Sequence, residues 1–173
     1  MNSRSLLHRS LSVLAVVLIC SLGGCQYDRW ASGFLKNQAD EKDLSGTYRV
    51  DADTLTRHIS IPMTTTELSI SRDAEIVLST DRTAKFLNVP DIDDRTRKPC
   101  IISGAGTWQQ NRNSNYVQIN VEILRTDASS STDGCGLKYY EALMLFGKKP
   151  PYKLHITIGD PDSGDALQFE KIR

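Results

Sequence analysis

Apolar and polar residues alternate with a period of two along most of the chain after residue 44. The alternation is clearest in residues 116–124, where every second position is valine or isoleucine. A period of two is typical of a strand that buries one of its faces. The same pattern predicts strands in residues 45–52, 66–71, 74–80, 83–89, 100–109, 137–146 and 152–158, and around Leu167 and Phe169.

Clusters of Gly, Pro, Asn, Asp and Ser separate these segments, and turns favour such residues. No long segment with a helical period follows residue 44. Short strands joined by hairpin-length loops are typical of an antiparallel sandwich or barrel. We predict an all-β fold, a small antiparallel meander barrel of about eight strands, because closure leaves no exposed sheet edge. A β-sandwich is the alternative.

Two of the predicted strands carry additional information about their surroundings. Residues 137–146 are apolar on both faces, which predicts a central strand or one covered by another element. In residues 152–158, His155 alternates with Leu154 and Ile156. We therefore expect the His155 side chain to face solvent, with a cavity as the alternative.

The first 25 residues have a different pattern. Arg4 and Arg9 precede a nearly unbroken apolar run over residues 11–22. A basic start followed by a short apolar run is typical of a secretory signal peptide. The run is shorter than the roughly 20 apolar residues that an ordinary membrane-spanning helix needs.

The sequence that ends this segment, Leu22-Gly23-Gly24-Cys25, resembles the lipobox of bacterial lipoproteins. The resemblance implies a thioether lipid on Cys25, cleavage before it and acylation of the new N-terminus, and several acyl chains anchor better than one. Because Gln26 rather than Asp follows, it also implies the outer membrane, facing the periplasm, in a double-membraned cell. In a single-membraned cell it implies the outer face of the plasma membrane. An ordinary signal peptide and an uncleaved anchor are the alternatives.

Cleavage would divide the chain into a signal peptide (1–24), a lipidated cysteine with a tether (25–44) and one β-barrel domain (45–173). The chain has 21 basic and 21 acidic residues, and the signal peptide removes two basic ones, which leaves a net charge of −2. A nearly neutral domain lacks the basic stripe expected of a nucleic-acid partner. It likewise predicts no polybasic patch for anionic lipid.

Four cysteines are present. Cys20 is discarded with the signal peptide and Cys25 is lipidated, which leaves Cys100 and Cys135. Because exported proteins fold in an oxidising compartment, we predict a Cys100–Cys135 disulfide. It would stabilise the fold by about 3–4 kcal/mol. Two buried, unpaired cysteines are the alternative.

Residues with metal-binding or catalytic chemistry are sparse. The acidic stretch 160–165 resembles part of a calcium loop but lacks its bidentate glutamate, so a polar turn is the better interpretation. Asp91, Asp93 and Asp94 precede a basic run and predict a solvated loop. No Gly-x-Ser-x-Gly elbow is present, and nothing pairs His58 with a nucleophile. We predict no metal, no cofactor and no catalytic residue.

A second resemblance concerns the barrel. Gly46-Thr47-Tyr48, Gly106-Thr107-Trp108 and the basic C-terminus with Lys171 and Arg173 resemble features of small lipocalin-like barrels. In that family a Gly-x-Trp lies on the first strand and a basic residue near the end packs over it. Here the first strand carries tyrosine, and the tryptophan comes later in the chain.

Aromatic residues suggest a cavity. Tyr48, Trp108, Tyr139, Tyr152 and Phe169 are candidates to line a ligand cavity, although aromatics also fill ordinary cores and eight-stranded barrels can be just filled. We therefore predict an envelope lipoprotein whose barrel binds a small apolar ligand or an envelope protein. The alternatives are a structural or interaction lipoprotein with a filled barrel and, third, an envelope hydrolase.

Overall fold

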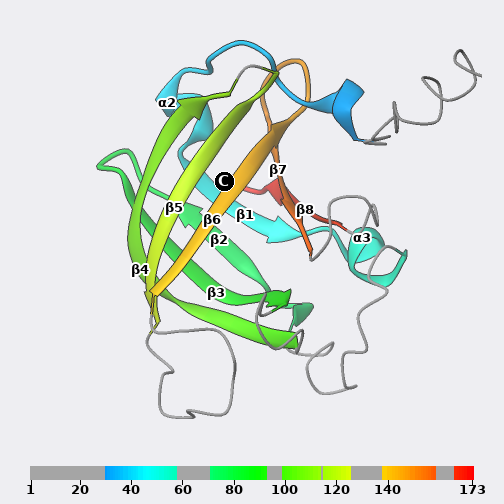
Figure 1. The fold of residues 1–173 in the computed structure, drawn as a ribbon, viewed down its shortest axis with the longest axis vertical. Helices are drawn as coiled ribbons and strands as arrows, with labels where there is room; N and C mark the ends of the chain where they lie inside the picture. The colour runs from blue at the N-terminus through cyan, green and yellow to red at the C-terminus, as the bar shows by residue number, and fades with distance from the viewer. Residues whose placement is uncertain (1–29, 58–70, 93–98, 114, 126–137, 159–165) are drawn as a thin grey trace, which may run out of the picture.

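The computed structural model describes residues 30–57, 71–92, 99–113, 115–125, 138–158 and 166–173. Eight antiparallel strands form one closed barrel in which each strand pairs with the next and the last pairs with the first (Figure 1). The predicted meander barrel is confirmed, and the alternative sandwich is not formed. The strands are β1 (Gly46–Val50), β2 (Glu75–Leu78), β3 (Thr83–Ile92), β4 (Pro99–Arg112), β5 (Val117–Arg125), β6 (Lys138–Phe146), β7 (Lys153–Thr157) and β8 (Ala166–Lys171).

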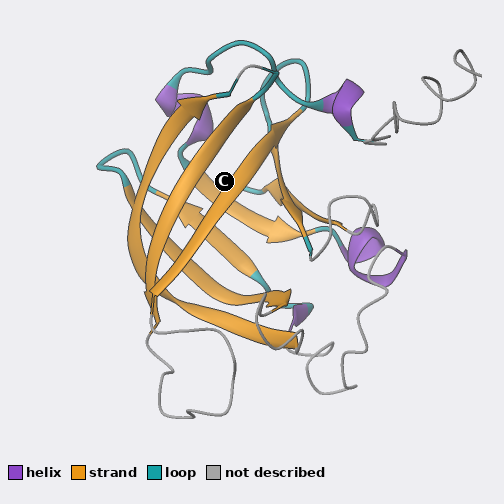
Figure 2. Ribbon diagram, viewed as in Figure 1, coloured by secondary structure: helices purple, strands orange, loops and turns teal. Residues whose placement is uncertain are grey.

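The described helices are short and lie outside the barrel (Figure 2). They are the 3-10 turn η1 (Ala31–Gly33), α2 (Glu41–Leu44) and α3 (Ala52–Arg57). None of these helices has the length and apolar character needed to cross a membrane. The predicted strand at residues 66–71 falls outside the described residues except for Ser71.

Inward-facing side chains pack the barrel interior. A side chain that lined a water-sized cavity would keep some accessible surface, because a water molecule would touch it. Many core residues have none, so the interior around them is filled, as expected for eight strands. Inward-facing residues with 0% exposure include Tyr48, Ile76, Phe86, Ile102, Ile119, Ile123, Leu143, Leu154, Ile156, Leu167 and Phe169.

The segment before β1 packs against the barrel. Phe34 forms a β-bridge with Phe146, and the Leu35 N–H donates to the Leu145 carbonyl at 2.8 Å. On the other side, the Val117 N–H donates to the Leu35 carbonyl at 2.8 Å. The sequence predicted a tether over residues 25–44, whereas residues 33–44 form part of the folded domain.

Helix α2 covers the end of the barrel where β1 begins and β8 ends. The buried Tyr48 hydroxyl donates to the Leu44 carbonyl at 2.6 Å, and the Lys171 ammonium donates to the Asp43 carbonyl at 2.9 Å. Lys171 Nζ also lies 5.9 Å from the Tyr48 ring centroid. Burial, together with the charge of Asp43, raises the pKa of Tyr48. The basic Lys171 near the C-terminus therefore packs over the aromatic residue of the first strand.

Two glycines let β4 approach β5 closely. A Cβ atom on Gly104 would overlap with the Leu124 carbonyl oxygen, and one on Gly106 would overlap with the Glu122 carbonyl oxygen. These are backbone atoms of the adjacent strand and have little freedom to move. The glycines therefore serve close backbone approach, one of the roles that glycine has in a strand.

Candidate functional site

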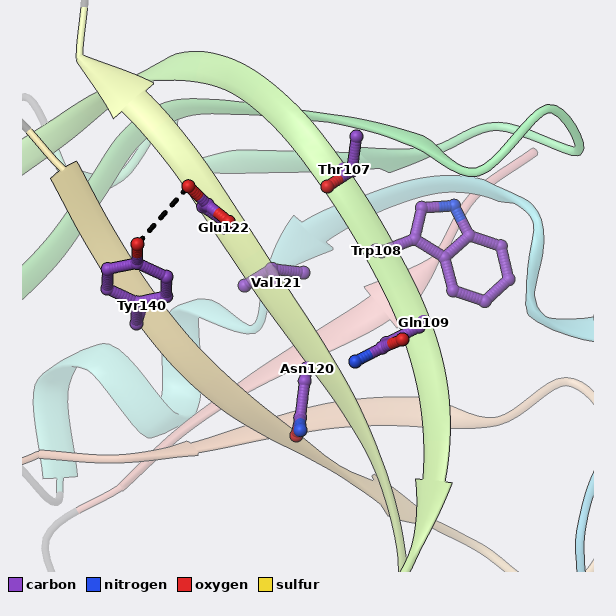
Figure 3. Close-up of a pocket in the computed structure, with 7 residues that line it drawn as sticks. All are labelled: Thr107, Trp108, Gln109, Asn120, Val121, Glu122 and Tyr140. Carbon is purple, nitrogen blue, oxygen red and sulfur yellow. Dashed lines mark hydrogen bonds between the residues drawn. The ribbon is translucent and has the colours of Figure 1, made fainter.

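An open groove of about 380 Å³ lies on the outer surface of β4, β5 and β6, which we call the β4–β6 face (Figure 3). Its polar side chains come from all three strands. Trp108 and Val121 border the groove mainly through their backbone, since their side chains are buried. The lining residues are Thr107, Trp108, Gln109, Asn120, Val121, Glu122 and Tyr140.

Strand register aligns the polar side chains in two rows. In one row Thr107 is opposite Glu122, which is opposite Tyr140, so that three strands each contribute one side chain. In the next row Gln109 is opposite Asn120. Neighbouring strands are about 4.8 Å apart, so side chains within a row are close enough to contact one ligand group together.

The Tyr140 hydroxyl donates a hydrogen bond to Glu122 Oε1 at 3.2 Å. This bond orients the only charged side chain among the groove's lining residues. The other polar groups are amides and a hydroxyl, which both donate and accept hydrogen bonds. The groove residues thus offer hydrogen-bond donors and acceptors from three adjacent strands.

Large apolar side chains are exposed on the same face. Tyr140 is 64% exposed and Leu124, two residues after Glu122 on β5, is 54% exposed. Leu87 is 42% exposed as well, but it lies on β3, outside the β4–β6 face. Single exposed apolar residues are normal on protein surfaces, whereas several on one face indicate an interaction site.

The residues predicted to line a cavity lie in the packed interior where they are described. Tyr48 and Phe169 are fully buried, Trp108 is nearly so, and Tyr152 is buried near the β6–β7 hairpin. The Trp108 indole N–H donates to the Ser79 carbonyl at 2.9 Å, which explains how its polar edge is accommodated. Tyr139 belongs to β6, but its side chain is outside the described part of the structure.

The prediction that His155 faces solvent is wrong. His155 does point outward from β7, but only 1% of it is exposed. Its ring lies 5.1 Å from that of Trp30 and 5.2 Å from that of Phe34, measured between centroids. The N-terminal segment covers this part of β7, so outward orientation does not mean exposure there.

Other predicted site residues are only partly described. Cys100 is buried at the start of β4 and is disulfide-bonded. Its predicted partner Cys135 lies outside the described residues, so that pairing stays a prediction. Cys25, His58, Asp93, Asp94 and residues 160–165 also lie outside them. Among the described residues, no group of three or more His, Cys, Asp or Glu side chains is arranged to hold a metal ion.

Comparisons with known proteins give no match to a family model, a curated protein or a solved structure.

The groove on the β4–β6 face was not predicted from the sequence. Two features of the sequence could have indicated the groove. They are the polar positions of the alternating strands and the aromatic Tyr140 at an outward position. These signals locate the side chains on one face, but they do not reveal that the curved sheet brings them around a shared groove.

Proposed function

We propose that this chain is a lipid-anchored protein of the cell envelope, held by Cys25, that binds a protein partner through the β4–β6 face. The observation that carries the proposal is a contrast between two described parts of the barrel. The interior is filled around the described core residues, whereas the outer groove is open, is lined by exposed Tyr140 and has exposed Leu124 on the same face. Tyrosine is enriched among the residues that dominate binding energy at protein interfaces.

A protein partner is supported better than a small apolar ligand. An apolar ligand requires an enclosed apolar space, whereas the packed interior leaves none beside Tyr48 or Phe169. The groove is open, with polar groups around a few apolar ones, which resembles the mixture found at protein interfaces. We therefore favour the interaction lipoprotein with a filled barrel.

The anchoring half of the proposal rests on the lipobox-like Leu22-Gly23-Gly24-Cys25. Replacing Cys25 by alanine removes the thiol that takes up the lipid. We expect the Cys25→Ala chain to lose its acyl mass in intact-protein mass spectrometry and to leave the membrane fraction. An unmodified mature chain with native Cys25 would contradict the lipid anchor.

The binding half is tested by photo-crosslinking in intact cells. A photoreactive phenylalanine analogue at position 140 should give an adduct with one partner, and the same analogue at the exposed Arg49 on the far side of the barrel should not. A Leu124→Ser change should weaken the adduct at position 140. Identical adducts at both positions, or none at position 140, would sink the proposed interface.

A further inference from the structure

Three segments distant in sequence meet at the end of the barrel that carries the N-terminal segment. The Gly147 N–H donates to the Gly33 carbonyl at 2.9 Å, which joins the β6–β7 hairpin to η1. Leu35 then bridges β6 and β5 through its own N–H and carbonyl. Arg112 is opposite Val117 in the β4–β5 ladder, so the end of β4 lies beside this bridge.

The three segments are basic. Residues 30–39, 110–118 and 146–153 contain no acidic residue. Their exposed basic side chains are Lys36, Arg112, Lys148 and Lys149. No ion pair links any of these four to another described residue. Although the mature chain as a whole has a net charge of −2, the fold gathers these four cations into a cationic cluster around the β6–β7 hairpin and the end of β4, where the sequence predicted no polybasic patch. The acidic residues Asp40 and Glu41 at the start of α2 lie at the same end of the barrel and form their ion pairs with Lys42 and Arg82.

The proposed lipid on Cys25 is attached only a short length of chain away from this cluster. Trp30 packs on the barrel, 6.1 Å from Phe146 and 5.1 Å from His155 between ring centroids. Cys25 precedes Trp30 by five residues, and a fully extended chain spans at most about 3.6 Å per residue. The acylated residue is therefore held within about 18 Å of Trp30, so this end of the barrel must stay close to the bilayer.

We propose that Lys36, Arg112, Lys148 and Lys149 bind the headgroups of anionic lipids and dock this end of the barrel on the membrane. The proposal rests on the lipid anchor of the proposed function, and it adds a specific orientation. Each basic side chain near an anionic surface strengthens binding about fivefold. The lipid brings the cluster to the surface, so even a few such contacts can hold the orientation.

The docked orientation keeps the candidate interface accessible. Strand β6 ends at Phe146, beside the cationic cluster, whereas Tyr140 lies six residues earlier on the same strand. Six residues of antiparallel strand span about 20 Å. The lipid surface and a protein partner at the β4–β6 face would therefore occupy different parts of the barrel.

Lysine reactivity measures the orientation without altering the protein. The lipidated protein is reconstituted into vesicles that contain one third phosphatidylglycerol, or into vesicles of phosphatidylcholine alone, and treated with an acetylating reagent. We expect Lys36, Lys148 and Lys149 to react severalfold more slowly than the exposed Lys85 of β3 in the anionic vesicles only. Equal reactivity of all four lysines, or equal protection in both vesicles, would overturn the proposal.

A double substitution tests the role of the hairpin. Lys148→Gln with Lys149→Gln should lower the ratio of docked to undocked barrels about thirtyfold and abolish the protection of Lys36. The matched control, Arg49→Gln with Arg72→Gln, removes two exposed cations elsewhere and should leave Lys36 protected. Loss of protection in both variants would contradict a local site.

The mass of the N-terminal peptide distinguishes failure of the lipid anchor from failure of the proposed orientation. An unlipidated Cys25 refutes the anchor, whereas a lipidated chain with uniform lysine reactivity refutes only the orientation.

Discussion

The outer surface of the barrel has two faces with similar sequence patterns and different surroundings. On the β4–β6 face, the outward residues Gln109 and Glu122 remain accessible to solvent. On the β7–β8 face, the outward residues His155 and Gln168 are buried, with 1% and 6% exposure. Both faces alternate polar and apolar residues, so the difference arises from what packs over them.

The part of this cover that includes α3 is tied to the backbone of Gln168 by two hydrogen bonds. The Asp51 N–H donates to the Gln168 carbonyl at 2.7 Å, and the Gln168 N–H donates to Thr54 Oγ1 at 3.2 Å. Buried polar groups are tolerated when they have such partners. An outward strand residue can therefore belong to a second core, one that lies between the barrel and the segments outside it.

The largest loss of stability is expected on the uncovered face, where the backbones of β4 and β5 approach each other closely. Gly106→Ala would force a Cβ atom into the Glu122 carbonyl of β5. Because neither strand can shift without breaking the ladder, we expect the free energy of unfolding to fall by at least about 4 kcal/mol. Denaturant unfolding would measure the loss, with the exposed neighbour Ala105→Ser as the control. A stable Gly106→Ala barrel would show that β4 and β5 can separate locally.

The next largest loss of stability is expected when the aromatic residue that covers one face is removed, and an aromatic residue on the other face provides the comparison. Phe34→Ala removes a ring buried against Phe146 and His155, so we expect a loss of about 3 kcal/mol in the free energy of unfolding. Tyr140→Ala removes an exposed ring and should change it by no more than about 0.5 kcal/mol. Equal losses in the two variants would remove the distinction between the covered and uncovered faces.

The barrel could be predicted from the sequence because alternation specifies which residues face the core. Val117, Ile119, Val121 and Ile123 alternate strictly, and all four are buried. Alternation does not specify what lies over the outward residues, because the cover comes from positions far away in the chain. Thr54 contacts Gln168 across more than a hundred residues, and nothing in the local pattern of either segment indicates this contact.

The candidate site was less predictable than the barrel. The described aromatic residues that were predicted to line a cavity are buried, and residues such as Phe169 pack the core. Tyr140 belongs to a predicted strand that is apolar on both faces, so the pattern did not show which face is exposed. Its exposure depends on where the N-terminal segment stops. That segment covers Phe146, at the far end of β6, and leaves Tyr140 open. The length of the cover therefore sets where the groove begins.

A threonine-to-valine change at the covered face and at the uncovered face compares their contributions to stability directly. Thr54→Val removes the hydroxyl that accepts from the Gln168 N–H and donates to the Asp51 carbonyl. Because a buried backbone N–H would lose its partner, we expect a loss of about 1–2 kcal/mol in the free energy of unfolding. Thr107→Val on the uncovered face should be nearly neutral, since Thr107 is exposed. Restoration by Thr54→Ser would assign the effect to the hydroxyl, whereas equal effects of the two valine changes would refute that assignment.

The smallest change in stability is expected at the β2–β3 hairpin, which is exposed and lies outside both faces. Asp81 Oδ1 accepts from the Thr83 hydroxyl at 2.7 Å and from the Thr83 N–H at 3.0 Å, and these bonds lower the Asp81 pKa below its usual 3.8. A lowered folded-state pKa gives stability that is present above the unfolded value and lost as the pH falls through the folded one. Asp81→Ala should therefore be slightly less stable than the native chain near neutral pH, and the difference should shrink steadily below about pH 4. Unfolding curves over this range would measure it, and a difference that persists in acid would show that the carboxylate charge is not its source.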